Sequence, residues 1–281
     1  MPDPSRLLTT LRRAVELTRS TPGRKGRLVT LHEAEDVLIC GDLHGNVGNF
    51  QVLMRTADLA THPRRHLVLQ EVIHSPFRYP GGGDKSHQLL DLYAALKCQF
   101  LERVHLLMGN HELAQWTDRP IIKEEENFNE LFAKGVREAY SDAALGIYTG
   151  YFDLFAVLPL GVRLTNRVFI SHSLPAVKYL PDFDLAQIET DELSASAYAP
   201  NGIVFGLLWG RDTAQAHVEA FLQKVDADWL VTGHIPCDEG YALANDRQII
   251  LDCAKSPAAY CLLPADRPLS REEFVASIHM V

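Results

Sequence analysis

The sequence lacks several features that mark other protein classes. It has 281 residues, and no stretch approaches the roughly 18 consecutive apolar residues that a membrane-spanning helix needs. The N-terminal segment carries Arg6, Arg12 and Arg13 without the apolar run of a secretory signal, so we expect a cytoplasmic protein. The five cysteines are odd in number and show no CxxC spacing, which suits reduced thiols.

Positive charge is also scarce in this chain. The 27 Lys and Arg residues oppose 36 Asp and Glu residues, which gives a net charge of −9. Proteins that bind nucleic acid without sequence preference depend on clustered Lys and Arg, so we expect no nucleic-acid partner and no membrane partner. The remaining composition, with 47% hydrophobic and 22% charged residues, is that of an ordinary globular protein.

The chain shows no internal repeat and no linker between domains. Apolar residues recur at helical spacing between Pro4 and Pro22, which predicts an amphipathic N-terminal helix. We therefore predict a helical extension over residues 1–30, one domain over residues 31–265 and a C-terminal tail over residues 266–281.

Apolar strand-like runs alternate with helical segments in the first half of the domain. The predicted strands are residues 36–40, 66–73 and 103–108, and the predicted helices are residues 47–60, 85–101 and, in a charged segment, 121–148. Further predicted strands are residues 161–165, 167–170, 229–232, 248–251 and 259–263. This order predicts an α/β fold with a two-sheet β-sandwich core flanked by helices.

Side chains that bind metals or transfer protons follow four of the predicted strands directly. Small residues, mostly glycine, accompany them and let the backbone approach closely. Open α/β folds bind ligands at the carboxyl ends of their strands, so this pattern predicts one site at one sheet edge. The residues are Asp42, His44, Asn110, His111, His172 and His234.

These blocks resemble the calcineurin-like metallophosphoesterases, and specifically their phosphoprotein phosphatase branch. The blocks Gly-Asp-Leu-His-Gly-Asn from residue 41 and Gly-Asn-His-Glu from residue 109 carry most of the resemblance. Residues 152–160, 207–209, 233–241 and 259–261 resemble further blocks of that branch. The resemblance covers residues 36–263 and implies the α/β/β/α sandwich of that family.

The resemblance also implies two divalent metal ions. Asp42 and His44 would bind the first ion, while Asn110, His172 and His234 would bind the second. Mn, Fe and Zn suit such oxygen and nitrogen ligands, and Mn is the expected ion.

The implied mechanism is hydrolysis by in-line attack. A hydroxide that bridges the two metal ions would attack phosphorus, and His111 would protonate the leaving oxygen as a general acid. Tyr260 matches a tyrosine of the family's closing block and would line the site.

The second block departs from the family pattern Gly-Asp-x-x-Asp-Arg. Residues 70–75 place Glu71 at the metal-bridging position, His74 at the position that orients the catalytic histidine, and Ser75 at the position of the arginine. Glutamate can bridge two metal ions only with altered geometry. His74 can hydrogen-bond His111 but supplies no fixed negative charge, and a clamp on phosphate is missing.

Two other arginines are candidates for that clamp. Arg78 follows the altered block, and Arg211 lies two residues after Trp209. Either can donate two hydrogen bonds to a phosphoryl group, and either can equally be an ordinary surface residue.

The predicted function is therefore a dinuclear-metal-dependent phosphomonoesterase that acts on phosphorylated protein or a small phosphate ester. One alternative is a phosphodiesterase or dinucleoside polyphosphate hydrolase, because related proteins with these ligands cleave such bonds. Another is a pseudophosphatase that binds phosphorylated partners with little turnover, which the altered block at Glu71, His74 and Ser75 favours.

Overall fold

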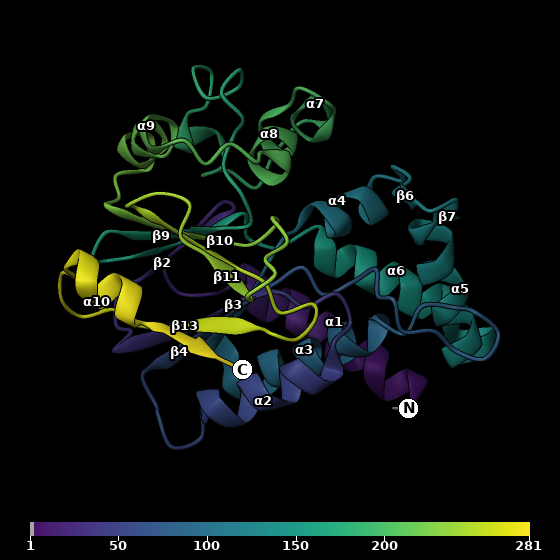
Figure 1. Cartoon of the computed structure of the whole chain (residues 1–281). Helices are drawn as coiled ribbons and strands as arrows, with labels where there is room; N and C mark the ends of the chain where they lie inside the picture. Colours follow the sequence, from purple (N-terminus) through teal and green to yellow (C-terminus); the bar gives the residue numbers. More distant parts are fainter. Residues whose placement is uncertain (1–2) are drawn as a thin grey trace.

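Two β-sheets packed face to face form the centre of the molecule, and helices cover their outer faces (Figure 1). The computed structural model describes residues 3–281. The smaller sheet has five strands in the order β14-β13-β3-β4-β5. Its strands are β3 (Asp36–Asp42), β4 (Arg65–Gln70), β5 (Val104–Leu107), β13 (Ala259–Pro264) and β14 (Ile278–Met280).

The larger sheet has seven strands in the order β1-β2-β8-β9-β10-β12-β11. These strands are β1 (Arg24–Lys25), β2 (Leu28–Leu31), β8 (Gly161–Leu164), β9 (Val168–Ser171), β10 (Trp229–Thr232), β11 (Tyr241–Ala242) and β12 (Gln248–Leu251). The predicted hairpin around Asn166 is confirmed, since β8 and β9 pair antiparallel. A separate hairpin joins β6 (Ile122–Lys123) to β7 (Glu126–Asn127).

Helices α2 and α3 lie below the five-stranded sheet in Figure 1, and α7 to α9 lie above the seven-stranded sheet. The helices are α1 (Pro4–Arg19), α2 (Val47–Ala57), α3 (His87–Phe100), α4 (Asn110–Trp116), α5 (Phe128–Tyr140), α6 (Ala144–Phe155), α7 (Ala195–Tyr198), α8 (Ile203–Trp209), α9 (Gln215–Val225) and α10 (Arg271–Ala276). Short 3₁₀ turns are η1 (Leu101–Arg103), η2 (Ser141–Ala143) and η3 (Leu185–Gln187).

The inner faces of both sheets share one apolar core. Val37 and Ile39 of β3 are fully buried against residues such as Ile170 of β9 and Val231 of β10. Burial of these β-branched residues on facing pleats drives the two sheets together. The predicted α/β fold with two sheets flanked by helices is thus confirmed.

The prediction of one helical segment over residues 121–148 is wrong. The structure has the β6–β7 hairpin at its start, where Glu124 and Glu125 turn the chain with positive φ angles of 52° and 66°. It then has two helices, because Ser141 at φ 47° ends α5 before α6 begins. The apolar residues keep their helical periodicity across both breaks. The residues with positive φ that cause the breaks are not glycine, so no glycine marks these positions in the sequence.

Both predicted terminal segments pack on the domain. Leu7 and Leu11 of α1 are buried, and α1 packs against α3 and α6. Strand β14 extends the five-stranded sheet by pairing with β13. Residues 1–2 of the predicted extension lie outside the described residues, and the proposed domain boundaries stay a prediction. No helix within residues 3–281 combines the length and apolarity that crossing a lipid bilayer requires.

The topology brings strand ends to one place. Strands β3, β4 and β5 are parallel to one another, and β9 and β10 are parallel in the other sheet. The carboxyl ends of parallel strands meet at the same sheet edge, so the segments that follow these five strands are neighbours. A parallel bridge between Asp42 and Asp252 joins the two sheets at this edge.

Helix α5 holds the loop that follows β4. The carboxylate of Asp84 accepts a hydrogen bond from the backbone N–H of Ser75 at 2.9 Å, and the backbone N–H of Asp84 donates to Leu131 of α5 at 2.9 Å. Gly135 of α5 lies against Asp84 so closely that an added Cβ would be 1.7 Å from the Asp84 carbonyl oxygen. The missing side chain therefore fixes how closely α5 approaches this loop.

We expect Gly135→Ala to lower the free energy of unfolding by about 3 kcal/mol, because α5 must move away from Asp84. The matched control is Gly146→Ala in α6, where an added Cβ meets only Leu8 at 3.8 Å. Alanine there should raise stability by up to about 1 kcal/mol through helix propensity. Urea unfolding measures the free energy of unfolding of both variants. Equal effects of the two substitutions would contradict the close packing of α5.

Candidate metal centre

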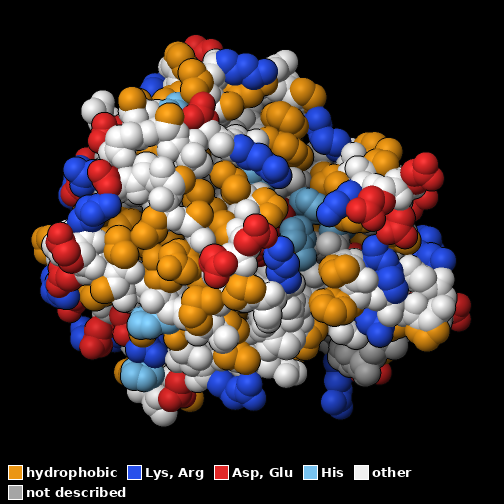
Figure 2. Space-filling view, viewed as in Figure 1, with side chains coloured by type: hydrophobic (Ala, Val, Ile, Leu, Met, Phe, Trp, Pro, Cys, Tyr) orange, Lys and Arg blue, Asp and Glu red, His pale blue; other side chains and the backbone are white. Residues whose placement is uncertain are grey.

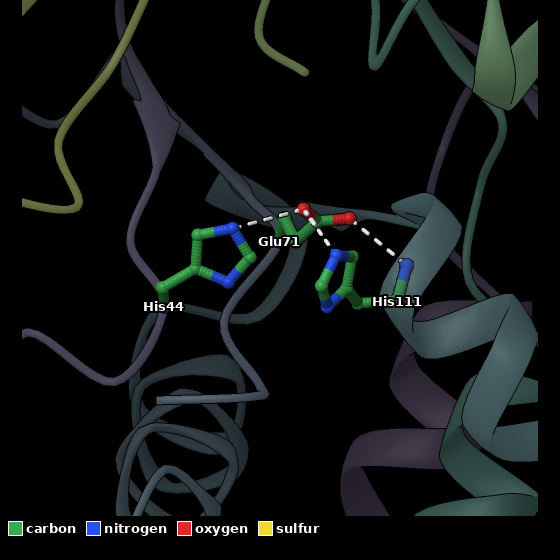
Figure 3. A group of neighbouring side chains, drawn as sticks. All are labelled: His44, Glu71 and His111. Atoms are coloured by element: carbon green, nitrogen blue, oxygen red, sulfur yellow. Dashed lines mark hydrogen bonds and ion pairs between the residues drawn. The ribbon is translucent and has the colours of Figure 1, made fainter. Parts of the chain in front are cut away.

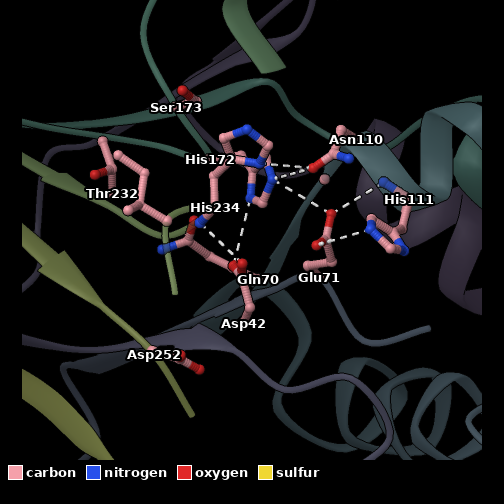
Figure 4. Close-up of polar contacts among 12 residues, drawn as sticks. Asp42, Gln70, Glu71, Asn110, His111, His172, Ser173, Thr232, His234 and Asp252 are labelled. Atoms are coloured by element: carbon pink, nitrogen blue, oxygen red, sulfur yellow. Dashed lines mark hydrogen bonds and ion pairs between the residues drawn. The ribbon is translucent and has the colours of Figure 1, made fainter. Parts of the chain in front are cut away.

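All six ligand-type residues predicted at strand ends converge in one cluster, His44 in Figure 3 and the other five in Figure 4. They are brought there by the two sheets and one helix. Asp42 ends β3, Asn110 and His111 begin α4, and the others, His44, His172 and His234, follow β3, β9 and β10 within two residues. Glu71, directly after β4, lies among them.

Glu71 lies at the centre of this cluster. Its Oε1 atom lies 3.2 Å from Nε2 of His44 and 3.9 Å from Nε2 of His111 (Figure 3). Its Oε2 atom lies 3.3 Å from Nε2 of His172 and accepts a hydrogen bond from the backbone N–H of His111 at 3.0 Å. The two carboxylate oxygens therefore face two different groups of ligands.

The second group is built around His172. Its Nδ1 atom lies 3.5 Å from Oδ1 of Asp42, and its Nε2 atom lies 2.9 Å from Oδ1 of Asn110. Nδ1 of His234 approaches the same Asn110 oxygen at 2.8 Å. The backbone N–H of His234 donates to Oδ2 of Asp42 at 2.8 Å and so fixes that carboxylate.

These residues fit divalent cations on two grounds. Oδ1 of Asp42 and Nδ1 of His172 are buried and have no hydrogen-bond partner, although buried polar atoms are normally satisfied. Two groups of potential ligand atoms, each within 4.8 Å of one another, occur in the described chain: His44, Glu71 and His111, and Asp42, Glu71 and His172. Carboxylate and imidazole donors of this kind suit Mn, Fe or Zn.

The charges in the cluster favour a cation as well. Burial and the nearby Glu71 raise the pKa of Asp42 well above its usual range, because two carboxylates lie close together in a buried place. Burial lowers the pKa of His172, and burial with His172 lowers the pKa of His234 to about 3. Both imidazoles are thus neutral, with a lone pair to offer.

Close backbone approach makes the cluster possible. A Cβ on Gly109 would be 2.3 Å from Oε2 of Glu71, and a Cβ on Gly233 would be 2.2 Å from Oδ1 of Asp42. His44, Glu71 and His234 all adopt positive φ angles, of 40°, 32° and 68°. Such strained conformations cost free energy and cluster at functional sites.

The cluster is reachable from solvent. The side chains of His44 and His111 are 22% and 16% exposed. Figure 2 shows histidine side chains in a hollow of the viewed face, with basic side chains beside them. The imidazoles of His44 and His111 are therefore in contact with solvent.

The two groups of potential ligand atoms share Glu71. Asp42 groups with Glu71 and His172, while His44 groups with Glu71 and His111. That Asp42 and His44 bind one metal ion stays a prediction, because these groups do not assign residues to ions. His44 has a positive φ of 40° and is turned to the loop after β4, where its Nδ1 contacts the carbonyl oxygen of Ile73 at 2.8 Å.

A chain of hydrogen bonds through His74 and Gln115 orients the ring of His111. Nδ1 of His111 lies 2.8 Å from Nδ1 of His74, and Nε2 of His74 lies 2.8 Å from Oε1 of Gln115. Because that amide oxygen only accepts, Nε2 of His74 carries the proton and its Nδ1 accepts from His111. Burial lowers the pKa of His74 to about 4, so it is neutral. The proton on Nδ1 of His111 leaves its Nε2 facing Glu71.

Glu112 joins the loop that carries Glu71 to the start of α4, which carries His111. One oxygen of its fully buried carboxylate accepts from the backbone N–H groups of Val72 and Ile73, at 2.9 and 3.2 Å. The other accepts from the N–H of Gly109 at 3.1 Å. Burial and the neighbouring Glu71 raise the pKa of Glu112 to about 7.

Of the two arginine candidates, only Arg211 is brought to the cluster. Its Nε donates to Nε2 of His234 at 3.2 Å. The Arg78 guanidinium instead donates to the carbonyl oxygen of Ser75, lies 3.5 Å from the carboxylate of Glu126 and covers the ring of Phe128. These contacts hold the loop after β4.

The observed contacts of Ser75 and Tyr260 are with residues outside the cluster. The hydroxyl of Ser75 accepts from the backbone N–H of Phe77 at 2.9 Å. Tyr260 lies within β13, paired with Cys40, and its ring stacks on His279 of β14 at 5.4 Å. No hydrogen bond, ion pair or ring contact within residues 3–281 joins Tyr260 to the predicted ligand residues, and its role at the site stays a prediction.

Sequence reasoning missed Gln115 and Glu112. Gln115 follows His111 by four residues, which places both on one face of α4, so helical spacing was the signal that could have found it. Glu112 is the third residue of α4, and its carboxylate accepts from the backbone N–H of the N-cap residue Gly109, which is the acidic half of a capping box.

The comparisons with known proteins agree with this geometry. A family model described as calcineurin-like phosphoesterase matches residues 36–238. That range exceeds half of the chain, so this protein belongs to the calcineurin-like phosphoesterase family.

Similar proteins of known name are phosphatases. The chain is 25% identical over 261 residues to a probable serine/threonine-protein phosphatase of Encephalitozoon cuniculi, covering 84% of this chain and 52% of that protein. It is 23% identical over 241 residues to serine/threonine-protein phosphatase 5 of Solanum lycopersicum, covering 79% of this chain and 39% of that protein. The chain thus spans about half the length, or less, of these relatives.

Solved structures show the same fold. A protein serine/threonine phosphatase from Saccharomyces cerevisiae superposes with a TM-score of 0.73 at 16% identity, covering 100% of this chain and 89% of that one. The cold-active protein-tyrosine phosphatase of a Shewanella species gives a TM-score of 0.61 at 15% identity, covering 94% and 84% of the two chains.

Proposed function

We propose that this protein is a phosphomonoesterase that binds two divalent cations and hydrolyses phosphorylated protein or a small phosphate ester. The observation that carries the proposal is the shared position of Glu71, whose two oxygens belong to both groups of ligand atoms. Glutamate thereby takes the bridging role expected from the sequence. The names of the relatives, all phosphatases, support the same reaction class.

Different residues of the cluster would have different roles in hydrolysis. When bound, the cations would polarise the phosphoryl oxygens and lower the pKa of a water molecule. Arg211, beside His234, would hold the anionic phosphoryl group. His111, oriented by His74, presents Nε2 toward the cluster. As an imidazolium, protonated on both nitrogens, it would deliver the Nε2 proton to the leaving oxygen and keep the Nδ1 proton in the hydrogen bond to His74.

Metal content and turnover test the proposal together. We expect protein equilibrated with Mn²⁺ and freed of loosely held ions to retain two ions per chain by elemental analysis. This protein should hydrolyse a phosphoserine peptide and para-nitrophenyl phosphate, and chelation should abolish both activities. Asp118→Asn, a change at an exposed residue, is the control that should alter neither result.

Other outcomes distinguish the alternatives. Two ions with cleavage of a phosphodiester but not of phosphomonoesters would favour the phosphodiesterase or dinucleoside polyphosphate hydrolase. One ion or none, with phosphopeptide binding but no turnover, would favour the pseudophosphatase, for which the neutral His74 and the absence of an arginine at position 75 argue. The identity of the metal and a cytoplasmic location stay predictions.

A further inference from the structure

A second hollow lies at the end of α4 remote from the metal ligand Asn110. It has a volume of about 690 Å³. Helix α4 runs from Asn110 at the metal centre to Trp116 at the hollow, which separates the two by about 9 Å along the helix. The residues that the argument uses are Arg27, Trp116, Arg119, Asp191, Leu193 and Tyr198.

Arg27 is a buried cation without a counter-ion. The residue is only 4% exposed, yet no carboxylate in residues 3–281 forms an ion pair with it. Its guanidinium donates to the carbonyl oxygen of Leu158 at 3.0 Å and to the hydroxyl of Tyr198 at 3.2 Å. Its Nε is buried and has no partner. Burying an unpaired charge is costly, so an incoming anion would relieve this cost.

Arg119 adds a second unpaired guanidinium. It packs over the rings of Phe205 and Trp209, at 4.9 and 5.8 Å from their centres. Its Nε is likewise buried without a hydrogen-bond partner. Asp191 is the one carboxylate among the lining residues, and it already pairs with Arg24 at 3.3 Å. The hollow therefore carries an excess of positive charge.

The rest of the lining is apolar or aromatic. Trp116 and Tyr198 meet edge to face, with ring centres 5.0 Å apart and planes at 81°. This contact closes the space in which a flat nucleobase would stack between the two rings. Leu193 and the ring of Trp116 instead offer apolar surface beside the two guanidinium groups.

We infer that this hollow binds a peptide segment of a partner protein in which an acidic side chain is next to an apolar one. The carboxylate would accept hydrogen bonds from the guanidinium groups of Arg27 and Arg119, which line the hollow, and the apolar side chain would lie against Trp116 and Leu193. A protein partner follows from the proposed phosphoprotein substrates, and this part of the inference rests on that proposal.

Binding of a peptide that cannot be hydrolysed tests the inference separately from turnover. The probe is a fluorescein-labelled, unphosphorylated peptide with repeated Glu-Leu pairs, and the control peptide has Gln in place of Glu. Fluorescence anisotropy is measured with the full chain, with and without a chelator. We expect the Glu peptide to bind at least about tenfold more tightly than the Gln peptide, and equally well after chelation.

Three variants locate the binding. Arg27→Met and Arg119→Gln should each weaken binding of the Glu peptide about tenfold, while Arg12→Gln, at an exposed arginine of α1, should not. If circular dichroism shows that Arg27→Met does not fold, Arg119→Gln, at a partly exposed residue, still tests the inference.

Several results would overturn the inference. Equal binding of the two peptides, loss of binding on chelation, or unchanged binding by folded Arg119→Gln would each do so. Thermal stabilisation by inorganic phosphate that depends on Arg27 or Arg119, without peptide binding, would assign the hollow to a free oxyanion instead. A protein that binds the Glu peptide but hydrolyses neither a phosphopeptide nor a small phosphate ester would refute the proposed function alone.

Discussion

Glu71→Gln is expected to reduce the retained metal from two ions per chain to at most one and to lower turnover roughly 1,000-fold. Glutamine has the same shape but only one oxygen and no negative charge, so it cannot face both groups of ligand atoms. Oε1 of Glu71 now faces His44 and Oε2 faces His172. Elemental analysis and steady-state kinetics with para-nitrophenyl phosphate measure both effects.

Glu71→Asp is the matched variant that keeps the charge. Aspartate is the residue that the family pattern has at this position, but its shorter side chain withdraws both oxygens from imidazoles that are now 3.2 and 3.3 Å away. We expect weaker metal retention and lower activity than in the original protein, with a smaller loss than in Glu71→Gln. Two firmly held ions in Glu71→Gln would show that Glu71 is not the bridge.

His111→Ala is expected to slow hydrolysis of phenyl phosphate by about 10² to 10⁴-fold, but that of para-nitrophenyl phosphate far less. Phenolate is a poor leaving group and needs a proton, whereas para-nitrophenolate leaves readily without one. The ratio of kcat/KM for the two esters measures the effect.

The exposed His62 supplies the control for this comparison, since His62→Ala should leave the ratio unchanged. Metal content must also be measured, because Nε2 of His111 lies 3.9 Å from Oε1 of Glu71. Equal losses for both esters at full metal content would mean that His111 does not act as the general acid.

The fold followed largely from local patterns. The strands at residues 229–232 and 248–251 coincide with β10 and β12, because their β-branched residues are buried on both faces and bounded by turn residues. The helix predicted over residues 121–148 was wrong because the breaks at Glu124 and Ser141 involve residues with no intrinsic preference for positive φ. Such breaks depend on what packs around them.

Much of the candidate site could likewise be predicted from the sequence. The spacing of ligand-type residues after strands, with the family resemblance, predicts that Asp42, Asn110, His172 and His234 lie together. It did not tell which arginine approaches the cluster. Arg78 and Arg211 had equal standing in the sequence, and only the packing of the loop after β4 directs Arg78 to Glu126 instead.

By itself, the sequence determined the succession of strands whose ends deliver these side chains and the replacement of an aspartate by Glu71, because both are properties of consecutive residues. The tertiary structure alone decided which side chains meet. The loop after β4 brings Glu71 to both groups of potential ligand atoms, Gln115 sets the tautomer of His74, and three separate segments leave Arg27 without an ion pair in the described chain. Each depends on contacts between residues far apart in the chain, which no local pattern encodes.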